Sequence, residues 1–129
     1  MKGLLLILGL SFYFISCEKA DAVSYSLAGK YTGIFHRTGL DTVPVTLFFD
    51  ADRFEGQGSR PYYPAICRGS FELDYTTVHF YDSCAWTANF DWSLILSGTY
   101  NIQISDGTVR IWKTHDSITD EYLLRQPYR

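Results

Sequence analysis

Short runs of alternating apolar and polar residues recur from residue 29 to residue 126, with turn residues between them. A period of two places successive side chains on opposite faces of a strand, so each run predicts a half-buried β-strand. Eight such runs are expected, at 29–37, 43–50, 53–60, 66–74, 77–84, 94–105, 108–115 and 118–126. Tyr, Phe and Trp make up 17% of the chain, which favours sheets over a helical bundle. The sequence therefore predicts an all-β, antiparallel fold.

Two short turns fix how neighbouring runs pair. Asp106-Gly107 is the strongest hairpin signal in the chain, because both central residues of a type I′ turn need positive φ. A second turn is expected at Ala51-Asp52. Together they set apolar pairs and one pair of opposite charge, namely Ile104 with Val109, Ile102 with Ile111, Phe49 with Phe54, and Asp50 with Arg53.

Two cysteines within the domain are expected to form a disulfide. A tight turn at Tyr75-Thr76 would join the runs 66–74 and 77–84 so that Cys67 lies opposite Cys84. The same register sets Phe71 against Phe80 and Leu73 against Val78 on one face, and Glu72 against His79 on the other. Tyr-Thr suits a two-residue primed turn poorly, but a four-residue loop would keep the register. The bridge would stabilise the fold by roughly 3 kcal/mol, a structural role.

The sequence also predicts a sheet that curls into a barrel. Gly56 and Gly58 occupy alternate positions of one run, and glycines inside a strand mark bends or close backbone approach. Barrels use such glycines to turn corners.

The first seventeen residues predict an export signal that ends in an acylated cysteine. Lys2 gives a positive start, residues 3–15 form an apolar run, and the small Ser16 precedes Cys17. The run is too short for a transmembrane helix, which needs about 20 apolar residues. We therefore expect a lipoprotein signal peptide at 1–16, a lipidated tether at 17–28 and a β-barrel domain at 29–129. An ordinary secretory signal with an incidental cysteine is the alternative.

Charge and motifs argue against several classes of function. The formal net charge is −3 with no run of Lys or Arg, so nucleic acid is not an expected partner. His36, His79 and His115 lie on different runs without the spacing of a zinc site, and neither a metal nor another cofactor is expected. We interpret His79 opposite Glu72 as ordinary cross-strand decoration and not as an acid–base couple. Asp82 is the carboxylate expected to point inward, where it needs a hydrogen-bonding partner or must stay protonated.

The aromatic segment 85–93 supplies most of the candidate binding site, and it is also where one or two helical turns are possible. Trp86, Phe90, Trp92 and Tyr100 could line a pocket at the barrel mouth, because ligand pockets have apolar walls with a few polar groups. Equally, these side chains could fill the mouth as a plug. The segment 59–65, SRPYYPA, has two prolines that predict an exposed loop able to contact a partner.

Two resemblances bear on fold and location. Gly29-Lys30-Tyr31 stands where calycins, the lipocalin and avidin group, carry Gly-x-Trp, with Tyr for Trp; this implies an eight-stranded up-and-down barrel. The chain also resembles a group of small bacterial surface lipoproteins, through Gly29-x-Tyr31-x-Gly33, Phe54-Glu55-Gly56 and a segment from Trp86 to Tyr100 reading Trp-Thr-Ala-x-Phe-Asp-Trp-x-Leu-Ile-Leu-x-Gly-x-Tyr. That likeness implies architecture and location but no activity, and the Cys67/Cys84 pair is not part of its pattern.

The sequence thus predicts a non-enzymatic, lipid-anchored barrel of the outer membrane, on its periplasmic face or at the surface, that binds a small apolar ligand. More than one acyl chain on a lipoprotein cysteine makes such anchoring stable. The alternative is a protein-interaction or peptidase-inhibitor-like module that acts through exposed loops. An enzyme is the third hypothesis. A ligand binder needs a cavity of several hundred Å³, an inhibitor an ordered protruding loop, and an enzyme converging ionisable groups.

Replacing Cys17 by alanine is expected to move the protein from the detergent-extracted membrane fraction to the soluble fraction, because the apolar run is removed or too short to hold it. Metabolic labelling with a fatty acid, followed by fractionation, measures this. Ser16→Gly keeps a small residue before the cysteine and should still be labelled. Label that survives in Cys17→Ala would rule out the anchor.

Overall fold

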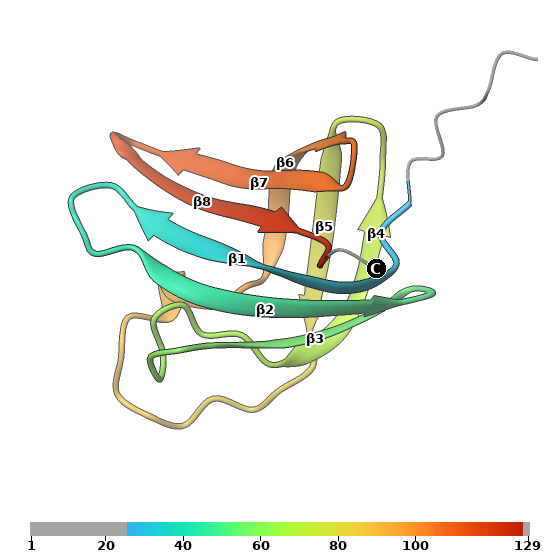
Figure 1. Ribbon diagram of the computed structural model, residues 1–129. Helices are drawn as coiled ribbons and strands as arrows, with labels where there is room; N and C mark the ends of the chain where they lie inside the picture. Colours follow the sequence, from blue (N-terminus) through green and yellow to red (C-terminus); the bar gives the residue numbers. More distant parts are fainter. Residues whose placement is uncertain (1–25, 128–129) are drawn as a thin grey trace, which may run out of the picture.

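The computed structural model describes residues 26–127, so the signal peptide, Cys17 and most of the predicted tether lie outside the described residues. Eight antiparallel strands form one closed barrel, in which each strand pairs with its neighbours in the chain and the last pairs with the first (Figure 1). The strands are β1 (Gly29–Arg37), β2 (Val43–Asp50), β3 (Arg53–Gly58), β4 (Arg68–Leu73), β5 (Thr77–Asp82), β6 (Gly98–Ser105), β7 (Thr108–His115) and β8 (Ile118–Arg125). The predicted eight-stranded up-and-down barrel is confirmed.

The predicted pairings are confirmed at the three hairpins that the sequence specified. Asp106 and Gly107 have φ values of 47° and 78°, the left-handed conformation that a type I′ turn needs. The partners across the hairpins are those expected, namely Ile104 with Val109, Ile102 with Ile111, Phe49 with Phe54, Asp50 with Arg53, Phe71 with Phe80, Leu73 with Val78, and Glu72 with His79. Alternation and turn chemistry therefore determine the register of the eight barrel strands, which we call the wall.

The predicted strands were too long beside the two longest loops. The run expected at 94–105 begins as a strand only at Gly98, and a short 3-10 helix, η1 (Trp92–Leu94), precedes it. Asp91 caps this helix, since its side chain accepts a hydrogen bond from the Ser93 backbone N–H at 3.0 Å. β3 ends at Gly58 and not at residue 60, close to the two prolines that cannot donate to a ladder.

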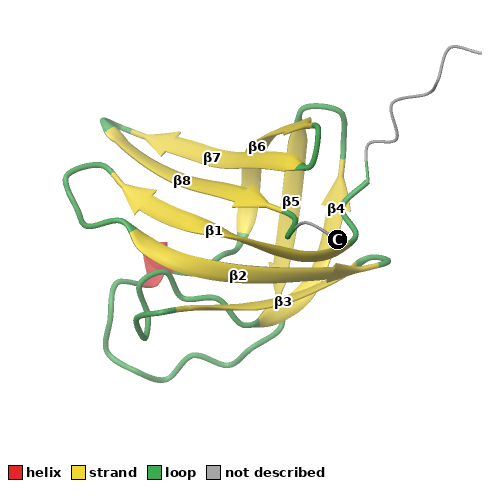
Figure 2. Cartoon of the chain, in the orientation of Figure 1, coloured by secondary structure: helices red, strands yellow, loops and turns green. Residues whose placement is uncertain are grey.

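The two ends of the barrel differ in their connections. At one, here called the tight-turn end, short turns join β2 to β3, β4 to β5 and β6 to β7, and the described chain enters and leaves the barrel (Figure 1). At the other, here called the loop end, β7 and β8 join by a short turn, whereas residues 38–42, 59–67 and 83–97 form longer connections (Figure 2). The last of these, between β5 and β6, carries η1.

Side chains fill the interior of the barrel. Inward residues alternate along every strand and form one buried apolar cluster, with Leu27 buried ahead of β1. Aromatic rings meet across this interior: Phe35 and Tyr122 have centroids 4.8 Å apart, and Phe54 and Phe80 are 5.1 Å apart. An eight-stranded barrel is just wide enough for its side chains to fill it.

Close backbone approach accounts for two glycines in the wall. A Cβ at Gly33 would overlap the backbone carbonyl of Leu123, across the seam where β1 meets β8. A Cβ at Gly69 would overlap the backbone carbonyl of Tyr81 in the same way. Glycine is the residue that lets these strands approach so closely.

Replacing Gly33 by alanine is expected to lower the free energy of unfolding by at least about 3 kcal/mol, because the methyl group would force β1 away from β8 at the closing seam. Urea unfolding measures this loss. Thr32→Ala, an exposed neighbour on the same strand, should cost less than about 1 kcal/mol. Equal stability of Gly33→Ala and the parent would show that the seam is not so tight.

Candidate binding site at the loop end

The four aromatic residues expected to line one pocket lie in two different places. Tyr100 is buried inside the barrel on β6, with its ring 5.6 Å from that of Phe80. Trp86, Phe90 and Trp92 lie instead outside the wall, in the connection between β5 and β6. The expected single lining of all four is therefore not formed, and their role in binding stays a prediction.

A tyrosine from another loop completes the outer cluster. Tyr62, in the connection between β3 and β4, stacks on Phe90 with ring centroids 4.5 Å apart and an angle of 19° between the planes. Phe90 also contacts Trp86 at 5.7 Å and Trp92 at 6.2 Å. We call Tyr62, Trp86, Phe90 and Trp92 the aromatic ledge. It is open to solvent, since Trp92 is 56% exposed and Tyr62 is 42% exposed.

The backbone of Tyr62 is strained. Its φ is 60°, a conformation that bulky residues rarely adopt and that costs roughly 1–3 kcal/mol. Such strain persists where surrounding contacts hold it, and here the stack on Phe90 is one such contact. The prolines of the sequence indicated this loop, but they did not indicate its partner.

Both indole N–H groups of the ledge are used within the protein. Trp86 Nε1 donates to Asp82 Oδ2, and Trp92 Nε1 donates to the carbonyl of Ala88 at 3.2 Å. Asp82 also accepts from the backbone N–H of Cys84 at 3.4 Å, so the carboxylate expected to need partners has them. Trp92, which is exposed, therefore offers mainly apolar surface to solvent, whereas Trp86 is half-buried.

The two loops that carry the ledge are fastened to each other. Cys67 and Cys84 form the predicted disulfide at their base. Further along, Ala65 pairs in parallel with the segment after η1: its N–H donates to the carbonyl of Leu94 at 3.0 Å, and its carbonyl accepts from the N–H of Leu96 at 2.9 Å. Ala65, Leu94 and Leu96 are all buried, so these loops cover the barrel mouth.

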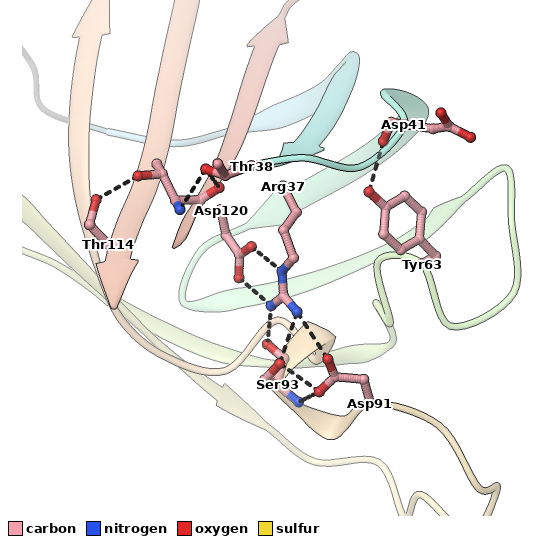
Figure 3. A network of polar contacts seen from close by, with 9 residues as sticks. Arg37, Thr38, Asp41, Tyr63, Asp91, Ser93, Thr114 and Asp120 are labelled. Atoms are coloured by element: carbon pink, nitrogen blue, oxygen red, sulfur yellow. Dashed lines mark hydrogen bonds and ion pairs between the residues drawn. The ribbon is translucent and has the colours of Figure 1, made fainter. Parts of the chain in front are cut away.

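A buried arginine ties the longer loop to the wall (Figure 3). Arg37, at the end of β1, donates from Nε and Nη2 to both carboxylate oxygens of Asp120 on β8, at 2.6 and 2.7 Å. Its Nη1 donates to Asp91 at 3.1 Å and to the Ser93 hydroxyl at 3.0 Å, and Nη2 also donates to the Ser93 carbonyl. A buried charge is stable when it is paired and hydrogen-bonded in this way.

These contacts shift the ionisation of the network. The hydrogen bond to Asp120 raises the pKa of Arg37, and burial opposes this only in part. The side chain and backbone of Ser93 lower the pKa of Asp91 by hydrogen bonding, and Arg37 lowers it further. Arg37 and Asp91 therefore both stay ionised near neutral pH. Sequence reasoning missed this network, although Arg37 shares the inward parity of Tyr31 and Phe35.

His79 and Glu72 do not form a couple. His79 Nδ1 lies 2.7 Å from the hydroxyl of Thr99, and Glu72 accepts from the hydroxyl of Tyr81 at 3.3 Å. Within residues 26–127, no group of three or more His, Cys, Asp or Glu side chains could hold a metal ion. No helix in that described part is long and apolar enough to cross a membrane.

The chain matches no known protein family, and neither a curated protein nor a solved structure is significantly similar to it. The resemblance to small surface lipoproteins therefore stays a prediction from motifs.

Replacing Arg37 by methionine is expected to lower the free energy of unfolding by about 3–5 kcal/mol, because Asp120 would remain buried without its partner. The double variant Arg37→Met/Asp120→Leu should recover most of that loss. Arg60→Met removes an exposed ion pair with Asp41 and should cost less than about 1 kcal/mol. Chemical unfolding of the four proteins decides this, and a loss in Arg37→Met no larger than in Arg60→Met would contradict it.

Proposed function

We propose that this protein is a lipid-anchored binding module of the cell envelope that recognises a protein partner through the aromatic ledge. The observation that carries the proposal is the solvent-exposed stack of rings from two separate loops, fastened to each other and to the wall. The envelope location and the anchor rest on the sequence of residues 1–17.

The form of the ledge supports a protein as the occupant. Trp and Tyr are enriched among the residues that dominate binding energy in protein interfaces, where they act as anchors. Rigid anchors lose little conformational freedom on binding, and the strained, stacked Tyr62 is an anchor of this kind. A peptidase is one class of partner that an exposed loop of this type would suit.

The charges beside the ledge argue against a membrane surface as its occupant. An anionic membrane surface attracts clusters of Lys and Arg, whereas the charges beside the ledge have mixed sign, as in the Arg60–Asp41 ion pair.

A small apolar ligand inside the barrel, the first hypothesis from the sequence, has less support. The interior is occupied by the protein's own side chains, and the two long loops cover the mouth. A ligand of ordinary size would have to displace packed rings such as Tyr100.

Site-specific photo-crosslinking tests the proposal in cells. A photoreactive amino acid at position 92 is expected to capture a discrete partner, because Trp92 is the most exposed ring of the ledge. The control is position 75 at the tight-turn end, where Tyr75 is 74% exposed. The captured partner is then purified, and its affinity is measured for the parent, Trp92→Ala and Tyr75→Ala.

Trp92→Ala should weaken that affinity at least about tenfold, or about 1.4 kcal/mol, whereas Tyr75→Ala should leave it unchanged. Capture of the same proteins from both positions, or equal affinities of the three proteins, would refute the ledge as an interface. Saturable binding of an apolar fluorescent probe that survives Trp92→Ala would favour an interior ligand instead.

A further inference from the structure

A hollow of about 370 Å³ opens at the loop end, between the β7–β8 turn and η1. It lies beside the Arg37 network and away from the rings of the aromatic ledge, none of which lines it. The charged residues that line it are Arg37, Lys113, Asp116 and Asp120, together with His115. Which ligand the hollow can bind therefore depends on which of these charged groups already have a partner in the protein.

All but one of these charged groups have a polar partner in the protein. Arg37 binds both oxygens of Asp120, and His115 Nδ1 lies 3.3 Å from Asp116 at the exposed rim. Lys113 is the exception: in the described part of the chain its ammonium group makes neither a hydrogen bond nor an ion pair. It lies instead over the ring of Tyr100, with Nζ 4.5 Å from the centroid.

The ring of Tyr100 satisfies the charge of Lys113 only in part. An aromatic face attracts a cation, but it offers no lone pair to the three N–H groups of the ammonium. Burial lowers the pKa of Lys113, although the negative Asp120 opposes this, and Arg37 lowers it further. The ammonium of Lys113 thus keeps N–H donors that no described group of the protein accepts.

We infer that this hollow binds a carboxylate group, with Lys113 Nζ donating hydrogen bonds to its oxygens. A single negative charge fits best, because Asp116 and Asp120 also line the hollow and would repel a doubly charged ion such as phosphate. The exposed side chain of Ile118 offers apolar contact to a short hydrocarbon attached to the carboxylate. Free short-chain acids and the Asp or Glu side chains of a protein share this chemistry.

Nuclear magnetic resonance of the full-length protein in detergent, with isotope-labelled lysine, tests the site directly. Acetate and butyrate should shift the Lys113 side-chain signal saturably, whereas chloride and phosphate at equal ionic strength should not. Lys113→Met should weaken butyrate binding at least tenfold, as followed on the backbone signals of Ile118 and Asp120. Lys30→Met, which removes an exposed lysine of β1, should leave it unchanged.

The source of the carboxylate follows from a second pair of probes, a blocked peptide with one glutamate and the same peptide with glutamine. Tighter binding of the glutamate peptide than of butyrate indicates a protein side chain, and the reverse order indicates a free acid. If the Lys113 signal of the parent protein does not saturate with butyrate, or responds equally to chloride, the proposed site is wrong. This result needs no variant. Trp92→Ala should leave butyrate binding intact. The carboxylate site and the aromatic ledge can therefore be tested independently, and failure of one does not imply failure of the other.

Discussion

The loop end of this barrel depends on one buried guanidinium. Arg37 extends the inward alternation of β1 to the mouth, where an unpaired charge would be costly. Its five donors are divided between Asp120 on the last strand and Asp91 and Ser93 beside η1. The same side chain thus closes the seam between the first and last strands and fixes the longest loop above it.

The fixed β5–β6 connection in turn holds the β3–β4 connection in place. The connection from β3 to β4 joins it through the disulfide and through the parallel pairing at Ala65. Tyr62 and Phe90 then stack, although each belongs to a segment without regular structure. An exposed surface that would be mobile on isolated loops is in this way ordered before any partner arrives, which lowers the entropic cost of binding.

The wall could be predicted from the sequence because its information is local. A period of two assigns each side chain to a face, and turns such as Asp106-Gly107 fix which residues face each other. The period alone cannot distinguish an extended loop from a strand. The sequence therefore predicted a strand from residue 94, whereas β6 begins at Gly98. The contacts of the site, such as Arg37 with Asp120, join residues distant in sequence, and alternation specifies the inward direction of each but not its partner.

Both ends of the described chain meet the barrel at the tight-turn end, on the side opposite the aromatic ledge and the Lys113 hollow. The proposed function therefore puts the lipid anchor and the recognition surface at opposite ends of the barrel. Doubling the length of a flexible loop costs only about 0.6 kcal/mol of closure entropy. Extra residues at the tips of the three long connections would therefore cost little, provided that the contacts of Arg37 and Ala65 and the disulfide are kept. The surface offered at the loop end could change in this way without any change in how the barrel closes.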